Sequence, residues 1–169
     1  MRSRTREKSE PGTRGELRAV DGLAQLSFLI HGTLERRAAE HDVSMTQTRL
    51  LGVLRDRTPT INELAKLLAL DKSSTSGLVA RAERRGLVAR IPSTTDRRSV
   101  EVALTDAGRS LVAQVSASFE ADVSKLLDRL RRSDRDALTS LVSRLLAAHA
   151  TAHGVDLFAT TDTQAPQRR

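Results

Sequence analysis

Two short helical patterns follow each other between residues 61 and 86, and this arrangement limits the fold of the chain more than any other feature. The first pattern repeats apolar residues at the spacing of one helix face, at Ile61, Leu64, Ala65 and Leu68. The second runs from Lys72 to Arg85, with Asp71 before it as a helix cap and Gly86 after it in the place of a left-handed terminal residue. Two short helices joined so tightly predict a helix-turn-helix.

Two segments of strand-like sequence come next, at residues 87–91 and 99–104. In the second segment apolar residues alternate with others, so that Val100, Val102 and Leu104 are expected to point inward. The link between the two segments includes the polar and basic sequence Pro-Ser-Thr-Thr-Asp-Arg-Arg. A helix-turn-helix followed by a strand, a basic loop and a strand is the layout of a winged helix, in which the tip of the hairpin is exposed.

Longer helical patterns flank this central region. One helix is expected over residues 16–40 and another over 45–57, and two more follow Thr105 with a break near Ser133. The predicted fold class is therefore mainly α with a small β-hairpin wing. The first helix and the last two display more apolar surface than the winged helix between them could cover. Because most soluble oligomers are two-fold homodimers, we expect these helices to interlock with those of a second copy, the alternative being a monomer in which they cap the core.

The same patterns divide the chain into five segments. Residues 1–15 are expected to form a flexible basic arm, 16–44 an N-terminal dimerisation helix, and 45–104 the winged helix-turn-helix domain that would bind DNA. Residues 105–152 are expected to form the C-terminal dimerisation helices. The final segment, 153–169, loses the helical periodicity and is expected to be a flexible tail.

The positive charge of the chain is concentrated in the central segment. The chain has 28 basic and 21 acidic residues, which give a net charge of +7, and +5 of this falls within residues 72–98. An evenly spread excess would indicate only solubility. An excess concentrated in one folded segment predicts a surface that binds a polyanion, most often nucleic acid.

Several other functions are excluded by what the sequence lacks. Without cysteine the chain can form no disulfide, thiolate nucleophile or cysteine zinc site. It has no Gly-rich phosphate loop, no His-Glu metal motif and no cluster of paired carboxylates, so we expect neither an enzyme nor a bound cofactor. His149 and His153 lie one helical turn apart, but no third metal ligand is evident nearby. The longest apolar runs have four residues where a membrane span needs about 20, and no signal-peptide core follows the N-terminus, which together predict a cytoplasmic protein.

Candidate contacts with nucleic acid gather in two places. The start of the second short helix carries small, hydroxylated or basic residues: Lys72, Ser73, Ser74, Thr75 and Ser76. Short hydroxyls donate to phosphates or base edges and let a helix N-terminus enter the major groove, although an ordinary capped turn is the alternative. Arg81 follows on the same helix and is a candidate for a base edge or a phosphate. Asp96, Arg97 and Arg98 occupy the predicted hairpin tip, where a carboxylate can orient an arginine that enters a narrow minor groove.

Four stretches of the chain resemble the MarR family of bacterial regulators. They are Pro59-Thr-Ile-Asn-Glu-Leu-Ala, Leu70-Asp-Lys-Ser-Ser, Arg84-Arg-Gly-Leu-Val and Asp96-Arg-Arg-Ser-Val-Glu-Val-Ala-Leu-Thr-Asp-Ala-Gly108. The resemblance implies a homodimeric winged-helix repressor, less often an activator, that binds a pseudo-palindromic operator in double-stranded DNA. It also implies that the helix from Lys72 to Arg85 enters the major groove, while Arg98 enters the minor groove braced by Asp96.

Many members of this family release DNA when a small phenolic or aromatic carboxylate binds between the dimer helices and the DNA-binding lobe. For such an effector, the candidate contacts at the expected junction are His31, His41 and Arg49. Each has a simpler interpretation: a helix-face histidine, a surface histidine near a helix end and an arginine in a structural ion pair. A peroxide-sensing branch of the family uses a reactive cysteine, which this chain lacks. The alternative function is a winged-helix module that binds another protein without specific DNA binding.

Overall fold

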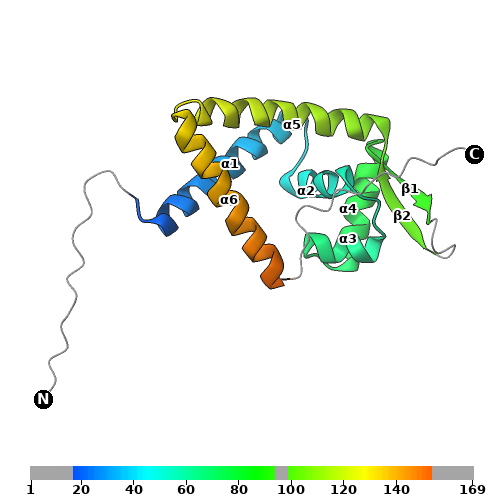
Figure 1. Cartoon of the computed structure of the whole chain (residues 1–169). Coiled ribbons are helices and arrows are strands. Elements are labelled where there is room, and N and C mark those ends of the chain that lie inside the picture. Colours follow the sequence, from blue (N-terminus) through cyan, green and yellow to red (C-terminus); the bar gives the residue numbers. More distant parts are fainter. Residues whose placement is uncertain (1–16, 94–98, 154–169) are drawn as a thin grey trace, which may run out of the picture.

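The computed structural model describes residues 17–93 and 99–153. These residues form, in order, α1 (Ala19–Ala39), α2 (Met45–Arg55), α3 (Ile61–Leu68), α4 (Lys72–Arg84), β1 (Val88–Pro92), β2 (Val100–Leu104), α5 (Asp106–Leu127) and α6 (Arg132–His153). The strands form one antiparallel hairpin, which confirms the mainly α fold with a small β wing (Figure 1). Among the described residues no helix combines the length and hydropathy that crossing a membrane requires.

Side-chain caps set the starts of the short helices. Ser44 and Gln47 form a reciprocal pair at the start of α2, in which each side chain accepts the backbone N–H of the other residue. Thr60 and Glu63 form the same arrangement at the start of α3. At the other end, α3 terminates at Ala69 in the left-handed conformation, with φ 53°. Because α3 ends at this left-handed residue, it is short, and α4 can begin soon after it, at Lys72.

The core lies where α2, α3, α4 and the hairpin meet. Its largest fully buried side chains are Leu50, Leu64, Leu68, Leu78, Val79, Val88, Val102 and Thr75. Leu111 and Val112 of α5 pack against this cluster from one side. Because α4 contributes Leu78 and Val79 to the core, its opposite face is left for other contacts.

The hairpin is attached to the helix-turn-helix at its base and projects from it. Val88 pairs with Leu104, and Pro92 pairs with Val100 at the far end. The N–H of Val102 also donates to the carbonyl of Pro59 at 2.9 Å, which ties β2 to the start of α3. The predicted inward alternation is right for Val102 and Leu104, which are buried, but wrong for Val100, which is 46% exposed. Val100 lies at the end of the hairpin that extends beyond the helices (Figure 1).

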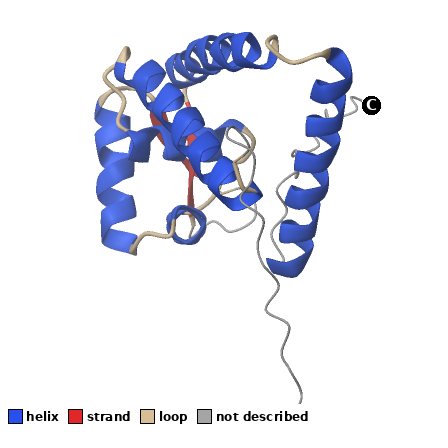
Figure 2. Cartoon of the chain, turned by 90° about the vertical axis from the view of Figure 1, so that its left-hand side faces the viewer, coloured by secondary structure: helices blue, strands red, loops and turns tan. Residues whose placement is uncertain are grey.

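The long helices are less enclosed than the helix-turn-helix. α1 packs against α5, whereas α6 stands apart from the rest of the chain (Figure 2). Ala38 is the one buried residue of α1, and residues 132–152 of α6 include none. Large apolar side chains are therefore exposed on both helices, at Val20, Leu23, Phe28, Leu29, Leu141 and Leu145 among others. The excess of apolar surface expected from the sequence is present in the single chain.

Candidate nucleic-acid interface

The carboxylate of Asp71 fixes the start of α4. Its Oδ1 accepts the backbone N–H of Ser74 at 2.8 Å, and its Oδ2 accepts the Ser74 hydroxyl at 2.6 Å. The bond from the Ser74 hydroxyl, followed by those from the Ser74 N–H and from Ser73, lowers the pKa of Asp71 to about 2. Because the hydroxyl proton of Ser74 is committed to this carboxylate, the lone pairs of Ser74 remain to accept a donor. That suits an amino group on a base edge better than a phosphate.

The predicted DNA contacts in the first two turns of α4 lie on two different faces of the helix. Lys72, Ser73 and Ser74 are exposed, and Ser76 is half-buried. Thr75 is 0% exposed, and its hydroxyl donates to the carbonyl of Asp71 at 2.8 Å. The prediction that Thr75 contacts DNA is therefore wrong: its side chain lies in the core and its hydroxyl is used within the helix.

The guanidinium of Arg81 lies over the preceding turn of α4. Its Nη1 is 3.5 Å from the position that a Cβ on Gly77 would occupy, and the side chain is exposed. A helical side chain leans toward the N-terminus of its helix, and Ser74, Gly77 and Arg81 share one face by their spacing. Gly77 leaves room above that face, which brings the guanidinium toward the exposed serines. The result is a polar, cationic surface on the side of α4 away from the core.

The other arginines near the end of α4 have different roles. Arg85 donates to the Asp42 carbonyl at 2.7 Å and to the His41 carbonyl at 3.0 Å. It thereby fastens the end of α4 to the turn after α1, a contact that the sequence analysis missed. Arg90 of β1 pairs with Glu83 of α4 at 2.5 Å. Part of the positive charge between residues 72 and 98 is thus used within the fold.

Two serines join the two strands just beyond the far end of the hairpin. The N–H of Ser93 donates to the carbonyl of Ser99 at 3.0 Å. The hydroxyl of Ser93, a buried residue, donates to Glu101 at 2.6 Å. Residues 94–98 connect these two points, so the predicted contacts Asp96, Arg97 and Arg98 lie outside the described residues.

A mostly apolar cavity of about 320 Å³ lies between α1, α2 and α5. Its apolar walls include Leu34, Val43, Leu51, Val112, Val115 and Phe119. Two arginines of α2, Arg49 and Arg55, also line it. An apolar cavity with a few cationic groups at its edge is suited to a small organic anion.

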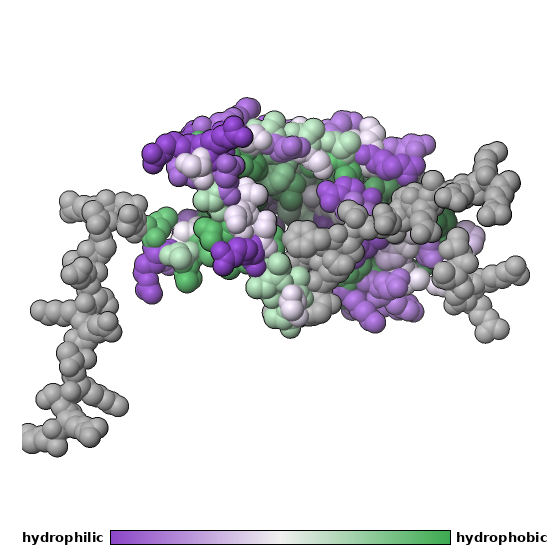
Figure 3. Space-filling view, viewed as in Figure 1, coloured by the Kyte–Doolittle hydropathy of each residue, from purple (hydrophilic) through white to green (hydrophobic). Residues whose placement is uncertain are grey.

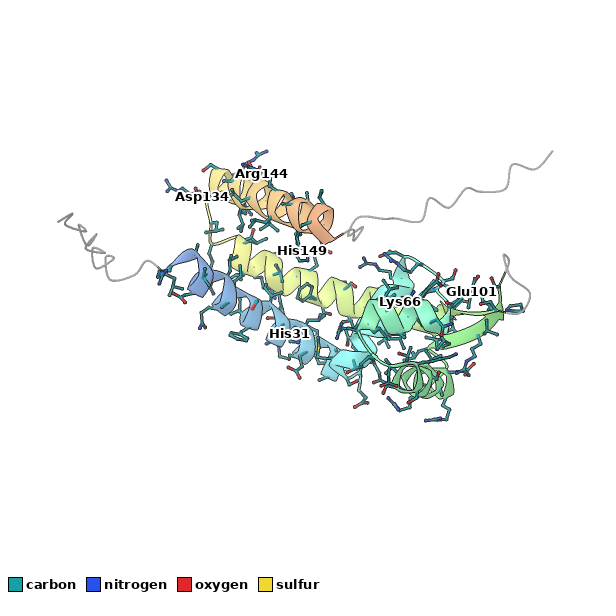
Figure 4. All side chains as sticks on the ribbon, turned by 90° about the horizontal axis from the view of Figure 1, so that it is seen from below. His31, Lys66, Glu101, Asp134, Arg144 and His149 are labelled. Carbon is teal, nitrogen blue, oxygen red and sulfur yellow. The ribbon has the colours of Figure 1, made fainter. Side chains whose placement is uncertain are left out.

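Only one of the three predicted effector contacts lies at this cavity. Arg49 lines it, and its Nη2 donates to the carbonyl of Leu68 at 3.2 Å. His31 lies on an exposed part of α1 (Figure 4) and His41 in the turn that follows, and neither lines the cavity, so the structure does not bring the three together. Sequence reasoning missed Arg55, whose guanidinium binds Asp56 at distances of 2.8–3.1 Å. The described residues contain no group of three His, Asp or Glu side chains placed to hold a metal ion.

Comparison with known proteins points to one family. The MarR family model matches residues 41–99. The uncharacterized HTH-type transcriptional regulator YfiV of Bacillus subtilis is 30% identical over 109 residues, which are 62% of this chain and 68% of YfiV. The homoprotocatechuate degradative operon repressor of Escherichia coli is 25% identical over 109 residues, which are 63% of this chain and 73% of the repressor.

Solved structures share the fold. The crystal structure of RV1404 from Mycobacterium tuberculosis has a TM-score of 0.68 and 28% identity, and the match covers 81% of this chain and 92% of RV1404. A variant of MepR from Staphylococcus aureus, bound to an oligodeoxyribonucleotide, has a TM-score of 0.58 and 21% identity, with 79% of this chain and 99% of MepR covered. At that identity the second likeness supports the fold alone.

Proposed function

The chain belongs to the MarR family of winged-helix transcriptional regulators, and we propose that it is a homodimeric repressor that binds a pseudo-palindromic operator and is released by a small aromatic carboxylate. Its relatives are regulators that act through DNA, and it is not an enzyme. The observation that carries the proposal is the exposed polar face of α4, where Ser74 and Arg81 lie on the side opposite the core.

In this proposal α4 is the recognition helix. Lys72 and Ser73, at the helix N-terminus, lie against the phosphates, to which the ammonium of Lys72 is attracted. Ser74, Ser76 and Arg81 approach the base edges in the major groove. At the wing tip Arg97 and Arg98, with Asp96 as a brace, contact the adjoining minor groove and its phosphates.

The exposed apolar faces of α1 and α6 support the dimer. Val20, Leu23 and Phe28 of α1 are 55–74% exposed, and Leu141 and Leu145 of α6 are 55–58% exposed. Apolar side chains are visible over these two helices in Figure 3. Burying one such side chain fully stabilises an assembly by about 1.5–3 kcal/mol. A partner that covers this exposed apolar face is therefore bound favourably. A second copy related by a two-fold axis covers both faces at once.

This assembly assigns a role to each part of the chain. Residues 45–104 form the DNA-binding domain, and residues 16–44 together with 105–152 form the dimerisation helices. Two copies then place their recognition helices about one turn of DNA apart, which requires half-sites about 10 base pairs apart.

The cavity beside α2 is the proposed effector site. It lies where the dimerisation helices meet the DNA-binding domain, because α1 and α5 form two of its sides and α2 the third. Its apolar walls accept an aromatic ring, and the guanidinium of Arg49 accepts the carboxylate. Arg55 is a weaker candidate for this role since Asp56 already neutralises it.

The experiment that tests DNA binding is a fluorescence-anisotropy titration against the intergenic DNA beside the gene, with nonspecific competitor and at two salt concentrations. We expect saturable binding that protects a pseudo-palindrome and weakens as salt rises, because lysines and arginines release counterions from DNA. Arg81→Ala is expected to lower the affinity about 10- to 100-fold and to relax the sequence preference.

Arg144→Ala is the matched control, because Arg144 is an exposed arginine on α6, away from α4 (Figure 4). It removes the same charge and is expected to leave operator binding within about twofold of the wild type. Equal losses in the two variants would mean that only net charge matters. Weak binding to any DNA sequence, without a protected palindrome, would favour the protein-interaction module instead.

A further inference from the structure

Arg49 connects the proposed effector cavity to the end of α3. Arg49 lines the cavity, and its Nη2 donates to the carbonyl of Leu68, the last residue of α3, at 3.2 Å. Among the described residues the ion pairs include Arg55 with Asp56 but none with Arg49. Within the described part of the chain, the guanidinium of Arg49 thus has a neutral partner, the Leu68 carbonyl, and no carboxylate partner.

The carbonyl that Arg49 binds belongs to the turn that positions α4. Carbonyls in the last turn of a helix have no partner within the helix, and a cation is favourable there. Ala69 follows at once with φ 53°, a left-handed conformation that an alanine holds only where its surroundings impose it. Two residues after Ala69, Asp71 caps α4. Arg49 of the cavity-lining helix α2 thus supports the strained turn between α3 and the recognition helix α4.

We propose that Arg49 is the coupling residue of this regulator: its guanidinium exchanges the Leu68 carbonyl for the carboxylate of a ligand in the cavity, and the freed turn 68–71 lets α4 leave its DNA-binding position. The inference rests on the proposed function and adds to it how the effector acts.

A carboxylate carries a negative charge and can accept two parallel N–H bonds from a guanidinium, whereas the Leu68 carbonyl is neutral and accepts one. The exchange is therefore favourable once the ligand is in the cavity. The turn at Ala69 then loses one of the contacts that hold it in a strained conformation. A ligand that binds better when the hydrogen bond from Arg49 to the Leu68 carbonyl is broken weakens DNA binding. By linkage, bound DNA weakens the binding of the ligand by the same factor.

The test compares the full chain with Arg49→Met and with Arg55→Met, the second being the matched control that removes another guanidinium from the same cavity. Salicylate is the probe, and two quantities are measured with and without it. These are operator affinity by anisotropy, and hydrogen exchange over residues 68–75, where the Leu70 and Thr75 amides are bonded to the Ala65 and Asp71 carbonyls.

Without any ligand, Arg49→Met is expected to behave like the ligand-bound wild type. Exchange over residues 68–75 should rise, and operator affinity should fall about 5- to 50-fold, with no further change when salicylate is added. Arg49→Lys keeps a cationic donor and should recover part of both. Arg55→Met should bind the operator within about twofold of the wild type and leave exchange over residues 68–75 unchanged in the absence of ligand.

Two results for the variant overturn the inference. One is wild-type affinity and wild-type exchange over residues 68–75 in Arg49→Met, even if salicylate binding is lost, because Arg49 would then only anchor the ligand. The other is a full salicylate response in Arg49→Met. Salicylate that binds the wild type without raising exchange over residues 68–75 overturns it as well.

Failure of the proposed function gives a different pattern. If the wild type binds no specific DNA, the exchange measurement still decides whether Arg49 holds the turn. If the wild type binds the operator but neither salicylate nor other aromatic carboxylates, the proposed effector class is refuted. The proposed switch of Arg49 from the Leu68 carbonyl to a ligand carboxylate is then refuted too, while the DNA-binding proposal stands.

Discussion

Arg37 of α1 and Asp122 of α5 form a two-point ion pair, with Nε to Oδ2 at 2.8 Å and Nη2 to Oδ1 at 2.9 Å. Arg36 adds a third bond to the same carboxylate at 3.1 Å. The hydrogen bond from Arg37 is the main cause that lowers the pKa of Asp122 to about 2. The paired arrangement fixes the two helices in rotation as well as distance, since both oxygens of the carboxylate are held.

This pair predicts a pH dependence of stability. The folded-state pKa of Asp122 lies below its ordinary value of 3.8, so the pair stabilises the fold fully above that pH. The stabilisation is lost as the pH falls from about 4 toward 2. Asp122→Asn should lower the melting temperature at pH 7 by a few degrees and flatten its decline between pH 4 and 2. Glu120→Gln, at an exposed carboxylate on the same helix, is the control, and an equal effect there would contradict the assignment.

Gly108, in the first turn of α5, is expected to tolerate no side chain. A Cβ at this position would overlap the carbonyl oxygen of Leu87 and lie 3.2 Å from Cδ2 of Leu104. Because the obstacle is backbone, Gly108→Ala should reduce the free energy of unfolding by about 3 kcal/mol or more, measured by urea denaturation. Gly52→Ala, in the open middle of α2, should instead add about 0.5–1 kcal/mol. A neutral Gly108→Ala would show that α5 is not packed so closely on the start of β1.

Ala69 offers the opposite case, a position where glycine should improve the fold. A left-handed conformation costs an alanine about 1–2 kcal/mol, whereas glycine loses up to about 1 kcal/mol of additional entropy on folding. Ala69→Gly should therefore raise the free energy of unfolding by about 0.5–1 kcal/mol in urea titrations without changing the slope. Ala65→Gly, inside α3, should lower it by about 1 kcal/mol. Equal losses in the two variants would refute the strain at Ala69.

The dimer is tested by placing a charge on α6. Leu145, 58% exposed in the single chain, would be buried by the second copy, so Leu145→Asp should give a monomer in analytical ultracentrifugation. Operator affinity should fall at least about 100-fold because the two half-sites are no longer bound together. Leu67→Asp makes the same change on α3, at a residue 42% exposed, and should leave the oligomeric state unaltered. A Leu145→Asp protein that remains dimeric would show that this face of α6 is not part of the dimer interface.

The elements of the fold were predictable because their signals are local. Caps and apolar spacing give α3 and α4 within a residue of their observed ends, and Gly86 has the expected positive φ of 68°. The faces of the elements were less predictable. Thr75 lies among serines that point outward, and only the packing of α4 against α3 shows that its side chain is buried. Val100 continues a correct alternation, but its strand extends past the core that would bury it.

Long-range partners could not be predicted from sequence at all. Arg37 and Asp122 are 85 residues apart, and Arg85 binds a carbonyl 43 residues away. A surface arginine has the same local sequence whether it binds such a partner or water. For the same reason, chemistry suggested His31 and Arg49 equally as effector contacts, while the packing of α1 and α2 around the cavity includes Arg49 and leaves His31 outside.

The separation of α6 from the rest of its own chain affects the fraction of regulator molecules that are active. Most of the stability of a helix in a protein comes from the packing of its apolar face, and none of residues 132–152 of α6 is fully buried within the chain. In the proposed homodimer, the order of α6 would be acquired together with the second copy, and stability would become a function of concentration. Newly made chains at low abundance would remain unpaired and inactive, and repression would switch on steeply once enough copies had accumulated. Gene dosage and degradation rate would then act on the regulator as directly as a bound ligand does.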